Sequence, residues 1–275
     1  MKKISIITIN YNNCEGLRRT IESVVNQTCR DFEYIIIDGG STDGSVDVIK
    51  RYADNIDYWV SEPDKGIYNA MNKGVAVAKG EYCLFMNSGD CLYNDSVIER
   101  VYEIADFNSD IIAGDVARNG GICDSPNEIT GVFMVKSALC HQTSFIKTET
   151  LRRLPYDESL KIVSDWKHMF QLLVIANGSY EHVKVVICEY DTTGFSAINW
   201  QVLADEREQV LSELLPSLVR KDYQVFLQNE EIYNRSPKLY DLFSKIGRES
   251  IDEKVVILTL RLVGFIRNIK RSLRL

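Results

Sequence analysis

The sequence predicts an α/β fold with a mostly parallel sheet flanked by helices. Short runs rich in β-branched residues alternate along the chain with stretches whose apolar residues recur at helical spacing. This alternation favours parallel strands joined by helices that cover both faces of the sheet. A chain of 275 residues, of which 45% are hydrophobic, is long enough for one large α/β domain and an appendage.

The predicted strands are short apolar runs, and they lie at residues 4–9, 32–38, 56–60, 81–86 and 110–116. Helical spacing after the first two strands is shown by Leu17, Ile21, Val24 and Val25, then by Val46, Ile49 and Tyr52. Later helices are expected through residues 97–101, from Asp165 onward and from 199 to Pro216, and a further strand over 182–190. The N-terminal order is therefore βαβαβαβ.

The charge and cysteine content restrict the function. A net charge of −7 argues against a nucleic-acid binder, because such a protein needs a basic face to neutralise phosphates. The seven cysteines include no C-x-x-C pair, which fits a reducing compartment better than a disulfide framework or a zinc site. No apolar run approaches the ~18 residues of a membrane span. We therefore expect a cytoplasmic protein.

Several predicted strands end in polar residues, at Asn10–Asn13, Asp38–Ser45 and Asn87–Asp90. Parallel sheets bind ligands beyond the carboxyl ends of their strands, so these residues are candidates for a site. The alternative is a set of strand-to-helix turns with helix caps. For Asp90 the capping role is less favoured, because residues 94–96 lie nearer the next helix. Asp90 could then bind a divalent cation that carries phosphates.

The nucleotide-binding motifs G-x-G-x-x-G and G-x-x-x-x-G-K-[ST] do not occur. Instead the sequence resembles the family 2 glycosyltransferases, which have the GT-A type of Rossmann-like fold. The resemblance rests on SIITINYN, IIIDGGSTDGS, DKGIYNAMNKGVAVAKGEYCLFMNSGD and SDWKHMF, at residues 5–12, 35–45, 64–90 and 164–170. These motifs match in order and spacing over about the first 200 residues, which is far more specific than any one of them.

The resemblance implies a nucleotide-sugar site, and the family's binding residues have counterparts in this sequence. Ile9, Asn10 and Tyr11 match the turn against the base, and Asp38 matches the acid that hydrogen-bonds the base or ribose. Asp64, Lys65 and Asn72 match the region that closes over the nucleotide. Ser88 and Gly89 match the residues beside the metal site. The implied donor is a UDP-sugar.

Asp90 matches the last acid of the family's D-x-D element, which holds Mn²⁺ or Mg²⁺ on the diphosphate. The common form has Asp where Asn87 and Gly89 stand, so this chain keeps one carboxylate of the element. Asp165 matches the general base, although its local pattern also fits an acid in the first turn of a helix. A base on the far side from the leaving group implies inversion at the anomeric carbon.

His141 and Gln142 stand just before a short predicted strand, and a similar pair occurs in relatives that add sugars to bacterial surface polysaccharides. The resemblance implies that this pair and Trp166 contact the acceptor or the diphosphate. A hydrogen-bonded structural histidine is the more common alternative. The loop 190–197 matches the family's mobile segment over the donor.

The resemblance divides the chain into a catalytic domain, 1–198, and a helical C-terminal extension, 199–275. Residues 254–275 contain several Lys and Arg and no acid. Such a helix favours peripheral contact with an anionic membrane, on the inner face of the cell membrane. It would equally fit a tail packed on the domain or on a second subunit of a homo-oligomer. Membrane contact would favour a lipid-linked saccharide as acceptor.

Three functions are therefore compared. The first is an inverting hexosyltransferase that moves a sugar from a nucleotide donor to a saccharide or lipid-linked saccharide, in polysaccharide biosynthesis. The second is a sugar-phosphate nucleotidyltransferase, which would need a glycine-rich basic loop where NYNNCEG stands. The third is a non-catalytic nucleotide-binding or membrane-scaffold subunit, against which Asp90 and Asp165 count.

Overall fold

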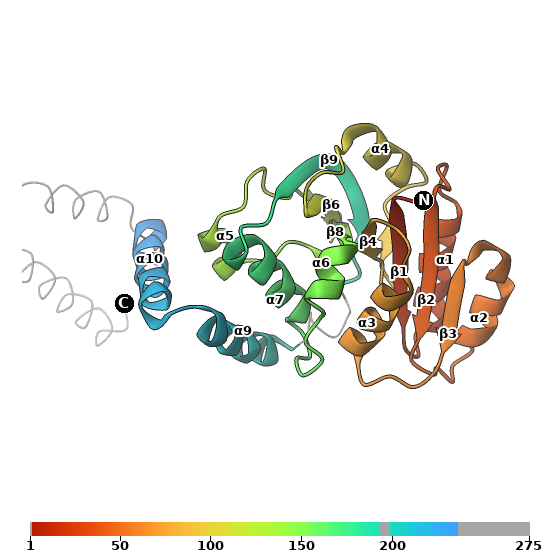
Figure 1. Ribbon diagram of the computed structural model, residues 1–275, viewed down its shortest axis with the longest axis horizontal. Helices are drawn as coiled ribbons and strands as arrows, with labels where there is room; N and C mark the ends of the chain where they lie inside the picture. The colour runs from red at the N-terminus through yellow and green to blue at the C-terminus, as the bar shows by residue number, and fades with distance from the viewer. Residues whose placement is uncertain (1, 193–198, 236–275) are drawn as a thin grey trace, which may run out of the picture. The chain divides into compact units, whose positions relative to one another are not determined.

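The computed structural model describes residues 2–192 and 199–235, and its contacts divide the chain into two units, 1–215 and 216–275. The first unit is a mixed sheet flanked by helices (Figure 1). Its strands lie in the order β3-β2-β1-β4-β8-β6-β9-β5, with β7 paired to β6. The predicted α/β class is confirmed.

The strands of the first half are β1 (Ile4–Asn10), β2 (Phe32–Asp38), β3 (Tyr58–Ser61) and β4 (Tyr82–Phe85). These four are mutually parallel, and their register places Asn10 beside Asp38. Nearly every side chain of β1, β2 and β4 is buried, because helices cover both faces of this half. The parallel register brings the polar strand ends to one edge of the sheet.

The second half of the sheet is mixed. Its strands are β5 (Cys91–Leu92), β6 (Ile111–Arg118), β7 (Gly121–Cys123), β8 (Ser144–Lys147) and β9 (Tyr180–Glu189). Strand β8 runs antiparallel between β4 and β6, whereas β6 and β9 are parallel. The residues just before β8 therefore lie at the same edge as the end of β4, since antiparallel neighbours start where their partners finish.

Helices α1 (Cys14–Val25), α2 (Ser45–Arg51) and α4 (Val97–Ile104) share one buried apolar cluster with the sheet. Helix α3 (Ile67–Val77) lies on the other face, where Gly74 fits against Ile7 and Ile37. The described part of the first unit also contains α5 (Gly131–Lys136), α6 (Thr148–Arg153), α7 (Ser164–Phe170), which continues into a π-helical turn over Gln171–Ile175, and α9 (Trp200–Leu214). Both faces of the parallel half are thus covered.

The second unit contains α10 (Ser217–Arg235), which has an amphipathic sequence. No helix within residues 2–192 and 199–235 is both long enough and apolar enough to cross a membrane. The basic stretch 254–275 and most of the expected lid loop 190–197 lie outside the described residues. Contacts assign α9 to the first unit, while the functional boundary between 198 and 199 stays a prediction.

Gly80, two residues before β4, packs directly against the backbone of β1. A Cβ atom at this position would lie 2.5 Å from the backbone nitrogen of Ser5 and 2.6 Å from the carbonyl carbon of Ile4. We expect Gly80→Ala to lower the free energy of unfolding by about 2–3 kcal/mol, because the backbone of a central strand must shift. Gly121→Ala is the control, since its Cβ would lie 3.9 Å from the backbone oxygen of Arg118, which is ordinary van der Waals contact. Equal denaturant midpoints for the two variants would contradict this account of the β1–β4 contact.

Candidate active site

The Asp38 carboxylate is the centre of the site at the ends of β1, β2 and β3. Its Oδ1 accepts hydrogen bonds from Asn10 Nδ2 (2.7 Å) and Ser41 Oγ (2.5 Å). Its Oδ2 accepts from the Ser41 backbone N–H (2.9 Å) and from Ser61 Oγ (2.6 Å). Burial alone would raise the pKa of Asp38, but these hydrogen bonds outweigh it and lower the pKa. The carboxylate therefore stays charged and joins three strand ends.

The residues around Asp38 form two layers. Ile9, Asn10 and Asp38 are buried, whereas the Tyr11 ring is 66% exposed. A Cβ atom on Gly39 would lie 2.5 Å from Asp64 Oδ2 and 3.1 Å from Tyr11 Cδ2, so these side chains meet directly above the glycine. Lys65, also exposed, follows Asp64 in the same loop. The outer layer, Tyr11, Asp64 and Lys65, can stack on a ring and contact polar groups of a ligand. The buried layer, Ile9, Asn10 and Asp38, supports it.

Asp90 lies at the turn that follows β4 and is 4% exposed. Its Oδ2 accepts from Gln142 Nε2 (3.0 Å), and its Oδ1 accepts from the backbone N–H of Asp191 (2.8 Å). Burial raises the pKa of Asp90 to about 7, although both hydrogen bonds act to lower it. A cation beside this carboxylate would favour its charged form. The buried carboxylate of Asp90 would thus be stabilised in its charged form by a positively charged partner.

The backbone at Gly89 explains why this turn has no side chain at position 89, where the common D-x-D element has an aspartate. The Gly89 φ of +111° lies in the region that favours glycine, and a Cβ atom there would lie 2.7 Å from Asp191 Oδ2. The Thr20 hydroxyl holds the turn by accepting from the Gly89 N–H (3.0 Å) and donating to the Asp90 carbonyl (2.7 Å). A carboxylate from Asp191 therefore lies close to the place that a side chain at position 89 would fill.

The oxygen donors near this turn fit a Mg²⁺-type or Mn²⁺-type ion. They are the carboxylates of Asp90 and Asp191, together with the buried Oδ1 of Asn87, which accepts no hydrogen bond from the described part of the chain. Hard cations take one or two protein carboxylates and complete their shell with phosphate oxygens and water. Within the described ranges, no group of three or more His, Cys, Asp or Glu side chains could hold a metal. Any ion here would share its coordination with a ligand.

Asp165 stands in the first turn of α7 and is partly exposed. The hydroxyl of the buried Tyr68, on α3, donates to Asp165 Oδ1 at 3.0 Å. The pKa of Tyr68 is raised well above its ordinary value by burial and by the charge of Asp165, so it remains the donor in this pair. Tyr68 thus holds one carboxylate oxygen of Asp165.

The consecutive residues His141 and Gln142 connect the two acids. Gln142 donates to Asp90, whereas the buried His141 is linked to Asp165 through Tyr156 and Tyr68, whose ring centroids lie 5.8 Å apart. His141 Nε2 lies 2.8 Å from Tyr156 Oη, and its ring stacks on Phe85 with 4.7 Å between the centroids. Burial lowers the pKa of His141, which favours the neutral ring. Of this predicted pair, Gln142 contacts Asp90 and His141 packs against Phe85 and Tyr156, while their contact with an acceptor or a diphosphate stays a prediction.

Two other predicted site residues have their polar groups bound within the protein. Trp166 is buried, and its Nε1 donates to the Met134 carbonyl at 2.8 Å. Asn72 exchanges hydrogen bonds with the backbone of Tyr156, at 2.9 and 3.0 Å, and also donates to Glu158. Their contacts with the acceptor and the nucleotide stay predictions. The geometry gives both residues a structural role.

Sequence reasoning missed Tyr68 and Asp191. Tyr68 stands inside the motif at 64–90, but a tyrosine at helical spacing reads as core, and it is indeed 5% exposed. Asp191 follows β9, about a hundred residues after Asp90, with no spacing that relates the two. Only the β5–β9 pairing, which sets Cys91 opposite Glu189, brings these positions together.

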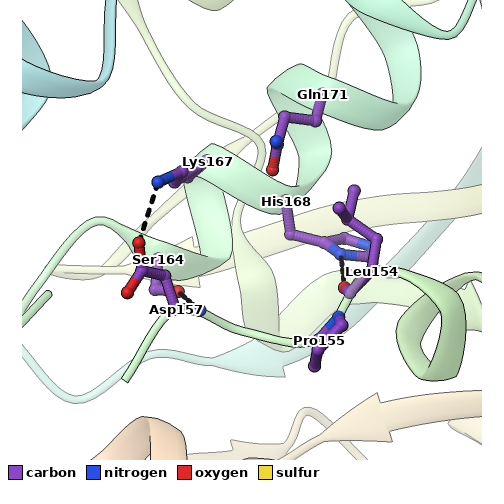
Figure 2. A pocket seen from close by; sticks show the side chains of 7 residues that line it. All are labelled: Leu154, Pro155, Asp157, Ser164, Lys167, His168 and Gln171. Carbon is purple, nitrogen blue, oxygen red and sulfur yellow. Dashed lines mark hydrogen bonds and ion pairs between the residues drawn. The ribbon is translucent and has the colours of Figure 1, made fainter. Parts of the chain in front are cut away.

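A cavity of about 200 Å³ lies beside α7, and its lining residues are Leu154, Pro155, Asp157, Ser164, Lys167, His168 and Gln171. Figure 2 shows the Lys167–Asp157 ion pair (2.8 Å) and the hydrogen bond between His168 Nδ1 and the Leu154 carbonyl (2.8 Å). Asp165 and Asp90 are not among the lining residues. The cavity is therefore separate from the acidic site at the sheet edge.

Sequence comparison finds a match to the family described as Glycosyl transferase family 2, over residues 5–162. An uncharacterized glycosyltransferase of Mycobacterium tuberculosis (strain CDC 1551) is 32% identical, with 89% of this chain and 98% of the relative covered. The poly(ribitol-phosphate) beta-N-acetylglucosaminyltransferase TarP of Staphylococcus aureus (strain N315) is 38% identical over 42% of this chain and 36% of TarP.

Structure comparison finds the same fold in two solved proteins. Residues 1–349 of S. aureus TarS, in complex with UDP-GlcNAc, match with a TM-score of 0.62 at 16% identity, covering 87% of this chain and 75% of that one. The mannosyltransferase PcManGT of Pyrobaculum calidifontis, in complex with GDP-Man and Mn²⁺, matches with a TM-score of 0.60 at 14% identity, covering 98% and 82%. The predicted GT-A type of fold is confirmed.

His168 is 1% exposed, and burial lowers its pKa to about 4. Because the folded pKa lies below the ordinary 6.5, the folded state favours neutral His168, and this stability is lost as the pH falls from 6.5 through 4. At ~1.4 kcal/mol per pH unit, the loss is on the order of 3 kcal/mol. His168→Asn keeps a donor for the Leu154 carbonyl and cannot titrate. Urea unfolding should show a shallower fall in stability over this range for the variant. Parallel curves would contradict a buried neutral histidine.

Proposed function

Because the chain belongs to glycosyltransferase family 2, we propose that it transfers a sugar from a nucleotide-diphosphate donor to a hydroxyl group of a saccharide acceptor. The observation that carries the proposal is the link between the two acids. Gln142 donates to Asp90, and the adjoining His141 contacts Tyr156, whose ring packs against Tyr68, the partner of Asp165. This chain of contacts supports a displacement reaction in which Asp90 serves the diphosphate and Asp165 serves as the base.

The donor we propose is a UDP-sugar. TarP is named as an N-acetylglucosaminyltransferase, and TarS was solved in complex with UDP-GlcNAc. These two likenesses favour uridine as the base of the donor. In this chain the exposed Tyr11 ring would stack on the base, and Asp64 and Lys65 would border the nucleotide. Asp38, whose four hydrogen bonds are all internal, would act through Ser41 and Ser61 or exchange one of them for the ribose.

Asp165 is the proposed general base. The acceptor oxygen forms a bond to the anomeric carbon while the bond from that carbon to the diphosphate oxygen breaks, and the leaving nucleoside diphosphate keeps the electron pair. The acceptor proton passes to the Asp165 oxygen that Tyr68 does not bind. Attack from the side opposite the leaving group inverts the anomeric carbon. Tyr68 orients the carboxylate for this transfer.

Asp90 and Asp191, with Asn87 Oδ1, would hold a divalent cation. When bound, such an ion neutralises charge on a departing diphosphate. Ser88 and Gly89 form the turn that keeps these oxygens in place, since the Ser88 N–H donates to the Ile9 carbonyl at 3.0 Å. Lys65, exposed beside the nucleotide side of the site, can add a positive charge.

The acceptor we propose is a saccharide or lipid-linked saccharide of a surface polysaccharide. Residues 1–198 would carry the chemistry, and 199–275 would serve peripheral membrane contact or assembly into a homo-oligomer, with the protein on the inner face of the cell membrane. The nucleotidyltransferase alternative has lost support, because the relatives reported above are named as glycosyltransferases.

The proposed base can be tested by release of nucleoside diphosphate from a panel of nucleotide sugars, with candidate saccharide acceptors and with Mn²⁺ or Mg²⁺. We expect Asp165→Asn to lower acceptor-dependent release by about 10²–10⁴-fold, the usual contribution of a general base, while UDP still binds. Asp54→Asn, which changes an exposed carboxylate on the surface, is the control. Retained turnover with lost UDP binding would overturn the assignment of roles.

The proposed ion site has a readout that needs no turnover. We expect Asp90→Asn and Asp191→Asn each to weaken Mn²⁺ binding in the presence of UDP by about tenfold or more, measured by electron paramagnetic resonance. Asp54→Asn should bind Mn²⁺ like the wild type. Unchanged Mn²⁺ affinity in the Asp191 variant would leave Asp90 as the sole carboxylate ligand and contradict the proposed pair.

A further inference from the structure

Helix α9 lies outside both the family match and the sequence motifs, yet it contacts the segment that carries Asp165. The Glu206 carboxylate accepts hydrogen bonds from three consecutive backbone N–H groups in the turn before α7. Its partners are Lys161 (2.7 Å), Ile162 (2.9 Å) and Val163 (3.3 Å). Val163 is the N-cap of α7 and has no side-chain cap of its own. Glu206 therefore supplies acceptors that the local sequence lacks.

The next residue of α9, Arg207, covers Trp166, which follows Asp165 in the sequence. Its guanidinium lies over the Trp166 ring, 4.5 Å from the centroid, and donates to the carbonyls of Lys136 and Ser137 at the end of α5. The Trp166 ring is also held by its hydrogen bond to Met134. The indole is thus fixed by α5 and α9 together, which fixes the helical turn that contains Asp165.

A third contact joins α9 to α7 two residues after Asp165. Lys167 Nζ lies 3.0 Å from Glu213 and 2.8 Å from Asp157. An exposed ion pair adds little stability alone, but Lys167 is mostly buried and bridges two acids. Residues 161–163, 166 and 167, which surround Asp165 in the sequence, are thus all held by α9.

We infer that α9 is a positioning element for the general base, with Glu206 and Arg207 as its principal residues. The inference rests on the proposed role of Asp165. Helix α7 has only seven α-helical residues before it changes to a π-helical turn, and so short a helix is not stable by itself. Tyr68 orients the carboxylate, whereas α9 holds the backbone from which it projects. Small displacements of a reacting group cost large factors in rate.

The test compares Glu206→Gln with Asp205→Asn in the full chain. Both variants replace a carboxylate by an amide on α9, but Asp205 is exposed and accepts a hydrogen bond from Gln201, one turn earlier on the same helix. The Gln amide would turn an N–H group toward backbone N–H groups of residues 161–163. We expect faster hydrogen exchange at these amides in Glu206→Gln alone. We also expect kcat for donor turnover to fall about 10–100-fold with the donor KM unchanged.

The second variant, Arg207→Lys, keeps the charge and removes the planar group over Trp166. We expect a smaller fall in kcat than for Glu206→Gln, again with unchanged UDP affinity. Wild-type exchange rates at residues 161–163 in Glu206→Gln would overturn the inference, as would a loss of UDP affinity equal to the loss in kcat. If the wild type turns over no nucleotide sugar, the proposed function fails, while the exchange data still decide whether α9 holds this segment.

Discussion

The rest of the site depends on the hydrogen bonds that the buried carboxylate of Asp38 accepts. Asp38 ends β2, and it receives hydrogen bonds from Asn10 at the end of β1 and from Ser61 at the end of β3. A buried charge without partners is very costly, so these groups must stay together for the fold to be stable. This need fixes the loops that leave the parallel strands, and those loops carry Tyr11 and Asp64.

The change from a parallel to a mixed sheet explains how a second acid reaches the same edge. Strand β8 pairs antiparallel with β4, so the His141–Gln142 turn that precedes β8 lies beside the turn that follows β4. Gln142 can therefore donate to Asp90. The pairing of β5 with β9 then adds Asp191 next to Gly89. The Asp191 carboxylate, from the segment after β9, thus lies close to the place that a side chain at position 89 would fill.

Asp165 depends on helices and not on the sheet. Tyr68 reaches it from α3, and α9 holds the surrounding turn through Glu206 and Arg207. Asp165 thus receives support from a part of the chain beyond residues 5–162, which carry the family match. Relatives that share the N-terminal sequence but differ after it would need another way to hold this acid.

The sequence by itself determined the α/β class, the positions of the N-terminal strands and the acids at their ends. It could do so because parallel buried strands read as apolar runs, and polar residues that stop such runs stand out locally. Asp38, Asp90 and Asp165 were all found in this way or through motifs in register with the family.

Only the tertiary structure decided which groups surround these acids. It showed that Asp38 is enclosed by internal hydrogen bonds, that His141 contacts Tyr156, and that Asp191 and Glu206 meet partners far away in the sequence. No local pattern encodes such contacts, because a carboxylate gains or loses its partners through strand pairing and helix packing between distant segments. The chemistry of each acid was visible in the sequence, and its surroundings were set by the fold.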